Sequence, residues 1–169
     1  MENKKNKFQD SELLRGRKKK QIGWDSVEKY ATTIVDNINA SNLYIDLLVG
    51  ISVSGMIPLV LVSKWLQNSN VDIINASSYH GTNRGELVIR QVPEYISGRS
   101  ILLLDDIIAT GTTFEQVVNI LIAQGAAKVY TASLVVSSVV CPPEKYPNFY
   151  GALVDRAPDE WICFPWDEY

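Results

Sequence analysis

Residues 101–113, near the middle of the chain, constrain the fold more than any other stretch. They begin with four aliphatic residues and continue with two adjacent carboxylates, Asp105 and Asp106. An unbroken apolar run of this kind is typical of a strand buried on both faces of a parallel sheet. A short loop rich in Thr and Gly follows, and then the helical pattern of residues 114–124. This order predicts a strand, a ligand-binding loop and a helix of an α/β domain.

The loop that follows the two carboxylates combines groups that suit a phosphorylated sugar. Gly111 lets the backbone approach a ligand closely because it has no Cβ. The hydroxyls of Thr110, Thr112 and Thr113, with the N–H groups that open the next helix, are suited to bind an anion. The two carboxylates would repel a phosphate, and they are better placed to accept hydrogen bonds from sugar hydroxyls or to meet a metal held by the ligand. The two kinds of group together indicate a ribose 5-phosphate site. The alternative is a strand that merely ends in an acidic turn.

The composition is that of an ordinary globular domain. The chain has 169 residues, of which 46% are hydrophobic and 21% charged, which suits one domain with a buried core and excludes a disordered chain. The sequence has no apolar run of about eighteen residues, and its N-terminus lacks the apolar segment of a secretion signal. Cys141 and Cys163 form neither a metal-binding spacing nor a disulfide framework. We therefore expect a cytoplasmic protein.

Charge is unevenly distributed along the chain, whose net charge is −3. Residues 1–20 carry eight Lys or Arg and three acidic residues, whereas residues 21–169 carry eight basic and sixteen acidic residues. The asymmetry predicts a flexible basic arm, residues 1–20, and a separate folded domain, residues 21–169. The arm could contact nucleic acid or another polyanion. A solvated tail is the simpler interpretation.

The rest of the domain is expected to alternate between helices and strands. Helices are expected at 22–38 and 59–66, and strands at 43–50, 71–77, 86–92, 128–136 and 150–154. Asp25 or Ser26 can cap the first helix, and Gly125 is suited to end the helix at 114–124. Ligands bind at the carboxyl ends of parallel strands, so the loops at three such ends are expected to share one site: 51–58, 78–85 and 105–113.

Residues 101–113 resemble the phosphoribosyl-pyrophosphate (PRPP) signature of type I phosphoribosyltransferases. From about residue 22 to residue 169, the chain is similar to the xanthine–guanine and hypoxanthine phosphoribosyltransferases of purine salvage. Three further segments carry this resemblance: Ser52 to Pro58 (pyrophosphate loop), Ser77-Ser78-Tyr79 (flexible catalytic loop), and Trp161-Ile162 with Pro165-Trp166-Asp167 (base-binding hood). The resemblance implies an α/β fold with a central, mainly parallel sheet flanked by helices and a small C-terminal hood.

The resemblance also implies a role for each matching residue. Asp105 and Asp106 would hold the ribose hydroxyls and the associated Mg2+, and Asp167 could contact a second magnesium ion. The PRPP-binding stretch would comprise Ala109, Thr110, Gly111, Thr112 and Thr113, with the last four on the 5-phosphate. The remaining positions face the pyrophosphate or the base: Ser54 and Gly55 against the pyrophosphate, Ser78 and Tyr79 closing over it, Trp161 stacking on the base and the Ile162 backbone reading its edge.

The reaction implied is displacement of pyrophosphate from carbon 1 of PRPP by a ring nitrogen of a purine-like base. Such a reaction needs a neutralised leaving group, a dry site and a positioned nucleophile more than a strong base. Magnesium is the cofactor that the resemblance implies, and a homo-oligomer is the expected assembly. The base itself and the number of subunits stay open.

Three positions depart from the family pattern. Ala109 stands where the oxopurine enzymes carry an acidic residue, although adenine phosphoribosyltransferases also carry Ala there. Val53 stands where the pyrophosphate loop usually carries Arg or Lys, and Val136 and Ser137 stand near the place of a Lys that reads the purine 6-oxo group. These departures keep a second hypothesis open: a catalytically diverged module that binds PRPP or a nucleotide and contacts nucleic acid through its basic arm. A purely structural domain would leave Asp105, Asp106 and the Thr-rich loop unexplained.

Overall fold

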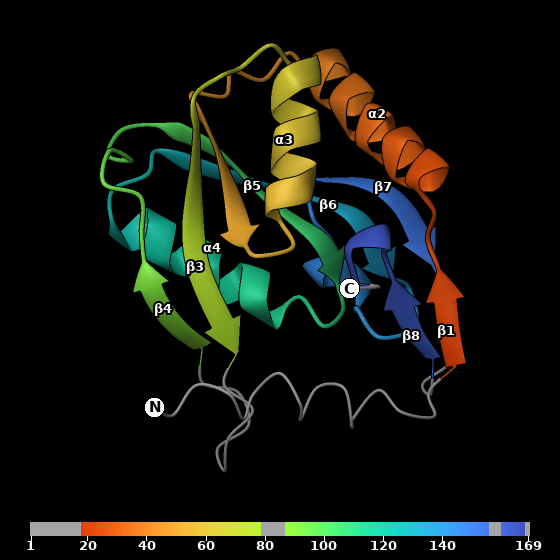
Figure 1. The fold of residues 1–169 in the computed structure, drawn as a ribbon. Coiled ribbons are helices and arrows are strands. Elements are labelled where there is room, and N and C mark those ends of the chain that lie inside the picture. The colour runs from red at the N-terminus through yellow and green to blue at the C-terminus, as the bar shows by residue number, and fades with distance from the viewer. Residues whose placement is uncertain (1–17, 79–86, 156–159, 168–169) are drawn as a thin grey trace, which may run out of the picture.

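The structure is a computed structural model, and it describes residues 18–78, 87–155 and 160–167 (Figure 1). Its elements, in chain order, are β1 (Lys18–Gln21), α2 (Trp24–Ala40), β2 (Leu47–Ser52), α3 (Met56–Trp65), β3 (Val71–Ser78), β4 (Leu87–Gln91), β5 (Ser100–Ile108), α4 (Thr112–Ala123), β6 (Lys128–Ser137), the 3-10 turn η1 (Pro143–Lys145), β7 (Phe149–Val154), β8 (Glu160–Cys163) and the 3-10 turn η2 (Pro165–Asp167).

Six strands form the central sheet, in the order β4-β3-β2-β5-β6-β7. All neighbouring pairs are parallel except β3 and β4, which are antiparallel at one edge. The apolar strand β5 lies in the interior of the sheet between β2 and β6, so both of its faces need cover. The predicted fold class, a mainly parallel sheet with flanking helices, is confirmed.

Helices cover both faces of the sheet (Figure 1). Side chains alternate along a strand, so Leu102 and Leu104 of β5 pack with α2 and α3, while Ile101 and Leu103 pack with α4 on the other face. All four of these side chains are fully buried. This arrangement holds the carboxyl end of β5 between two packed helix layers.

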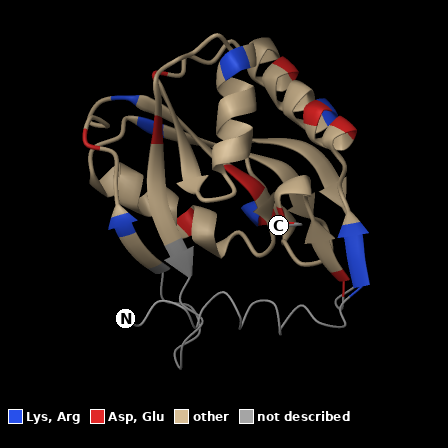
Figure 2. Ribbon diagram, in the orientation of Figure 1, with Lys and Arg blue, Asp and Glu red and all other residues tan. Residues whose placement is uncertain are grey.

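The small C-terminal hood is built from both ends of the described chain. Strands β1 and β8 pair in parallel, with Lys19 opposite Trp161 and Lys20 opposite Ile162. The N–H of Ile22 also donates to the carbonyl of Cys163 at 2.8 Å. Residues 18–20, which were included in the predicted arm, are therefore part of a strand, the basic one in Figure 2. Residues 1–17 lie outside the described residues, and the arm stays a prediction.

Two details of the expected elements are corrected. The prediction that Asp25 or Ser26 caps α2 is wrong, because Gly23 is the N-cap residue and no side chain bonds there; its carbonyl accepts the N–H groups of Ser26 and Val27 at 3.1 Å each. Strand β5 does not stop before the carboxylates but continues to Ile108, which stays in register with Val136 of β6. The end of α4 at Gly125 is confirmed, since this glycine has φ +93°. No helix in the described ranges is long and apolar enough to cross a membrane.

Candidate active site

The two carboxylates of the PRPP-like stretch lie within the last residues of β5. Oδ1 of Asp105 accepts the backbone N–H of Asp106 at 3.0 Å, which fixes the first carboxylate against the main chain. Oδ2 of Asp106 accepts the indole Nε1–H of Trp166 at 3.1 Å, and the Asp106 side chain is only 6% exposed. The acid pair is therefore anchored by the strand on one side and by the hood on the other.

Both carboxyl groups lie in surroundings that favour their neutral forms. Burial raises the pKa of Asp105 well above its usual range, and the neighbouring charge of Asp106 raises it further. Burial also raises the pKa of Asp106; the hydrogen bond from Trp166 acts in the opposite direction, and the charge of Asp167 adds to the increase. Three acidic groups from β5 and η2 thus influence one another. A cation or a set of hydroxyl donors placed among them would relieve their repulsion.

The loop after β5 has the geometry of an anion site. Gly111 is the N-cap residue of α4 and has φ +76°, in the left-handed region that favours glycine. The hydroxyl of Thr110 donates to the Thr112 hydroxyl at 3.1 Å and accepts the Thr112 N–H at 3.4 Å. Thr113 lies in the first turn of α4, whose opening N–H groups lie at the same loop. The predicted phosphate-binding residues are therefore gathered at one helix N-terminus.

The loop of the predicted pyrophosphate site packs directly on β5. A Cβ added at Gly55 would lie 2.5 Å from the carbonyl oxygen of Ile51 and 2.7 Å from that of Leu104. Only glycine fits there. The carbonyl of Ser54 accepts the N–H of Ile57 at 3.2 Å, which starts α3. Leu104 immediately precedes Asp105, so this loop is brought next to the acid pair.

The hood places the predicted base-binding residues on β8. The Trp161 side chain is 40% exposed, and Ile162 is buried in the core. Oδ2 of Asp167 accepts the backbone N–H of Phe164 at 2.9 Å, which closes the turn η2. Because Asp167 is close enough to influence the pKa of Asp106, the structure brings the hood to the acid pair.

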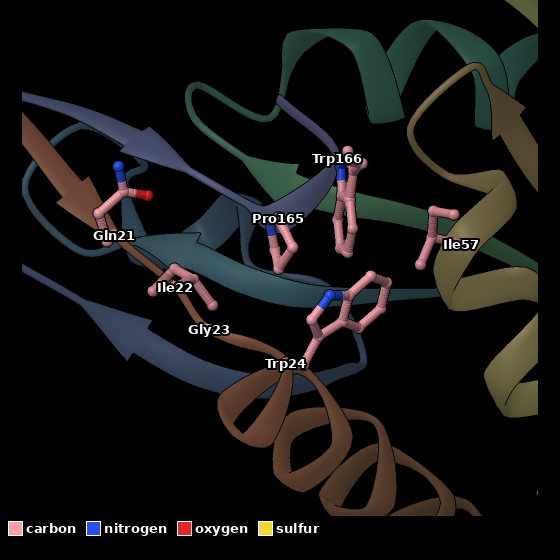
Figure 3. A pocket seen from close by; sticks show the side chains of 7 residues that line it. All are labelled: Gln21, Ile22, Gly23, Trp24, Ile57, Pro165 and Trp166. Atoms are coloured by element: carbon pink, nitrogen blue, oxygen red, sulfur yellow. The ribbon is translucent and has the colours of Figure 1, made fainter. Parts of the chain in front are cut away.

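A pocket of about 480 Å³ lies beside this junction (Figure 3). In Figure 3, Trp24 of α2, Ile57 of α3 and Trp166 of η2 border the same space. The rings of Trp24 and Trp166 are 5.7 Å apart and tilted by 59°. Trp161 does not line this pocket. Trp166 is the site residue to which the sequence predictions assigned no role, since its contact with Asp106 spans sixty residues of the chain.

Comparison with known proteins decides the family. The phosphoribosyl transferase domain matches residues 18–169, which include every described element. The chain belongs to this family. The predicted membership of the type I phosphoribosyltransferases is thereby confirmed.

Individual relatives agree with the family match. The xanthine–guanine phosphoribosyltransferase of Cereibacter sphaeroides is 26% identical over 152 residues, which cover 86% of this chain and 85% of the relative. The crystal structure of a purine phosphoribosyltransferase from Pyrococcus horikoshii has a TM-score of 0.73 at 24% identity and covers 89% of this chain and 95% of its own. A hypothetical protein from Neisseria gonorrhoeae, solved with bound ppGpp, has a TM-score of 0.72 at 22% identity, with coverages of 89% and 90%. The two solved structures show that the fold is shared.

The positions of this phosphoribosyl transferase domain that depart from the family pattern differ in their exposure to solvent. Val53 is 80% exposed in the loop between β2 and α3, so an apolar side chain projects where the resemblance implies a cation. Val136 and Ser137 are both fully buried in β6. Ala109 is half-buried beside the phosphate loop. The aliphatic stem of Lys145 packs on Gly111 of that loop, and its ammonium group pairs with Glu115 at 2.8 Å.

Two of the predicted site residues are not covered by the structure of the domain. Ser78 is the last residue of β3, but its side chain is not among the described ones. Tyr79 lies outside the described residues. Their predicted role in closing over the pyrophosphate stays a prediction.

The donors at the acid pair fit a magnesium ion that is carried partly by a ligand. Among the described residues, no three or more His, Cys, Asp or Glu side chains gather into a metal-binding cluster. Asp105 and Asp106 nevertheless offer carboxylate oxygens, the donors that magnesium prefers. Magnesium usually keeps several waters and takes oxygens from substrate phosphates, so one or two carboxylates are an adequate protein contribution.

Proposed function

We propose that this protein is a magnesium-dependent phosphoribosyltransferase that transfers the 5-phosphoribosyl group from PRPP to a purine-like base and releases pyrophosphate. The family match and the xanthine–guanine relative support this activity. One structural observation supports it most directly. Asp105 and Asp106, the loop of residues 109–113 and the Ser54–Gly55 loop meet at the carboxyl end of β5. A sugar phosphate that carries a second anionic group fits these three features together.

The acid pair acts on the sugar in this proposal. Asp105 and Asp106, when ionised, accept hydrogen bonds from the ribose hydroxyls, and these bonds favour the ionised forms that burial disfavours. The 5-phosphate lies on the N–H groups that open α4 and on the hydroxyls of Thr110 and Thr112. The sugar is thus held at both ends, so its carbon 1 has one orientation relative to the hood.

The pyrophosphate group would face Ser54 and Gly55, whose loop packs on β5. Asp106 and Asp167 are the residues that would hold magnesium. When bound, the metal neutralises the charge that develops on the leaving pyrophosphate. The exposed Trp161 ring offers a stacking surface for the base, and the Ile162 backbone offers hydrogen-bonding groups for its edge.

A pyrophosphate-release assay tests the proposal. PRPP and magnesium are supplied with a panel of purines, pyrimidines and nicotinamide derivatives. At least one purine-like base is expected to give turnover, and Asp106→Asn is expected to abolish it while the variant keeps its folded circular-dichroism spectrum. The absence of turnover with every base would rule out the enzymatic proposal.

A nucleotide-binding module without turnover is the second candidate. The exposed Val53, which provides no cation for pyrophosphate, favours it, as does the bound ppGpp of the N. gonorrhoeae structure. Calorimetric binding of PRPP or a guanine nucleotide without pyrophosphate release would identify this case. Binding of nucleic acid that disappears at high salt and on deletion of residues 1–17 would assign the arm to it.

We also propose that the protein self-associates through the face that carries α3. Val53, Met56 and Val60 are 80%, 40% and 56% exposed, although they belong to one apolar segment. Large exposed apolar side chains grouped in this way are typical of a contact surface. Light scattering coupled to size-exclusion chromatography is expected to give a mass of two or more chains, and Val60→Lys is expected to reduce it.

A further inference from the structure

An indole of the hood contacts the carboxyl group that is proposed to bind the sugar. Trp166 donates its Nε1–H to Oδ2 of Asp106 at 3.1 Å. The acceptor is only 6% exposed. In a buried, low-dielectric site this hydrogen bond restricts the orientation of the carboxyl group.

The position of the Trp166 ring is itself determined by its neighbours. Phe164 is 1% exposed and stacks on Trp166 with centroids 4.7 Å apart and planes inclined by 5°. The turn that presents both rings is closed by Asp167, which accepts the Phe164 N–H at 2.9 Å. The indole therefore cannot rotate freely about its side-chain bonds, and its N–H points to Asp106 from a rigid base.

We infer that Trp166 is a positioning residue for PRPP, which it affects through Asp106. This inference rests on the proposed function. With Oδ2 held by the indole, the Asp106 carboxyl group keeps one orientation toward a ribose hydroxyl or a metal-bound group. The carboxylate then need not be ordered when the sugar binds, which preserves affinity.

Trp166→Phe is the decisive variant, because it removes the N–H and keeps an aromatic ring for Phe164. Trp24→Phe is its matched control: it changes the tryptophan on the other side of the same pocket, which is 57% exposed and has its ring 5.7 Å from that of Trp166, and it leaves the Nε1–H of Trp166 in place. We expect Trp166→Phe to raise the KM for PRPP by about tenfold, the usual effect of losing one hydrogen bond to a charged group. We expect Trp24→Phe to change it by less than about threefold.

A second readout separates positioning from a structural effect. A general loosening of the hood would raise the KM for the base together with the KM for PRPP, whereas the inferred role raises only the latter. If turnover is absent but PRPP binds, the calorimetric Kd for PRPP replaces the KM and the same contrast is expected. An unchanged PRPP constant in Trp166→Phe, or an equal change in both variants, overturns the inference and leaves the proposed function intact. A wild-type protein that neither turns over nor binds PRPP overturns both.

Discussion

The side chain of Lys145 packs over Gly111, so that a Cβ on the glycine would lie 2.8 Å from the Cβ and 3.2 Å from the Cδ of the lysine. These residues come from different loops: Gly111 opens α4, and Lys145 ends the turn η1 between β6 and β7. Beyond Gly111, the lysine Nζ contacts Oε2 of Glu115 at 2.8 Å. The lysine stem thus lies across the loop that is expected to hold the 5-phosphate, and its ammonium group reaches the first turn of α4.

Gly111→Ala is expected to destabilise the protein and to weaken PRPP binding. A side chain in the left-handed region costs about 1–2 kcal/mol, and the overlap with Lys145 adds roughly 1–3 kcal/mol. Gly98→Ala is the matched control, because Gly98 has a similar φ of +74° with nothing within 4 Å of an added Cβ. Urea unfolding of both variants measures the difference. Equal destabilisation would contradict the packing of Lys145 on the loop.

Lys145→Gln is expected to raise the KM for PRPP about three- to tenfold, since it removes a charge-assisted contact at the phosphate loop. The hydrogen bond and charge of Glu115 raise the pKa of Lys145, so the lysine stays charged through neutral pH. Without the Lys145 charge, the Glu115 carboxylate in the first turn of α4 would have no cation paired with it in this contact and would repel a phosphate. Lys128→Gln removes the same charge at the opposite end of β6 and serves as the control in steady-state kinetics. A similar KM in the two variants would remove Lys145 from the phosphate site.

Gly55→Ala is expected to lower the free energy of unfolding by about 1–3 kcal/mol, because the added methyl group would overlap backbone atoms of β2 and β5. The loop can accommodate it only by moving away from Leu104, so turnover is expected to fall as well. Gly23→Ala meets nothing within 4 Å, and its effect as a changed N-cap residue is expected to stay below about 1 kcal/mol. Denaturant titration and the pyrophosphate-release assay compare the two variants.

Asp105→Asn is expected to abolish turnover and yet to raise the melting temperature at neutral pH. Burial and the charge of Asp106 raise the pKa of Asp105 in the folded protein, so the folded state binds the proton more tightly than the unfolded chain does. The Asp105 contribution to stability is then fully present at pH below its ordinary pKa and is lost as the pH rises through the raised folded pKa. The advantage of Asn is therefore expected to be small at about pH 4 and to grow toward pH 7. Thermal melts at several pH values test this; an advantage that shrinks with rising pH would contradict it.

Several features of the fold and site could be predicted from short stretches of sequence. The apolar run before Asp105 indicates a buried strand, because a strand that is covered on both faces has apolar residues at every position rather than at every second one. Gly111 and Gly125 mark the two ends of α4 because each has the positive φ that glycine adopts without strain. The pairing of Asp105 and Asp106 with a Thr-rich loop depends on neighbours in the chain, and this local signal led to the family.

Other features depend on contacts between distant segments, and only the tertiary structure decides them. The pairing of Lys19 with Trp161 joins β1 to β8 across most of the chain. Neither strand has an alternation of polar and apolar residues that would predict this pairing. The bond between Trp166 and Asp106 and the packing of Lys145 on Gly111 follow from how the hood and the turn η1 settle on the end of β5. Local composition determines which strand, loop and helix can form. Which side chains meet at the end of that strand is determined by sheet order and packing, and these depend on the whole chain.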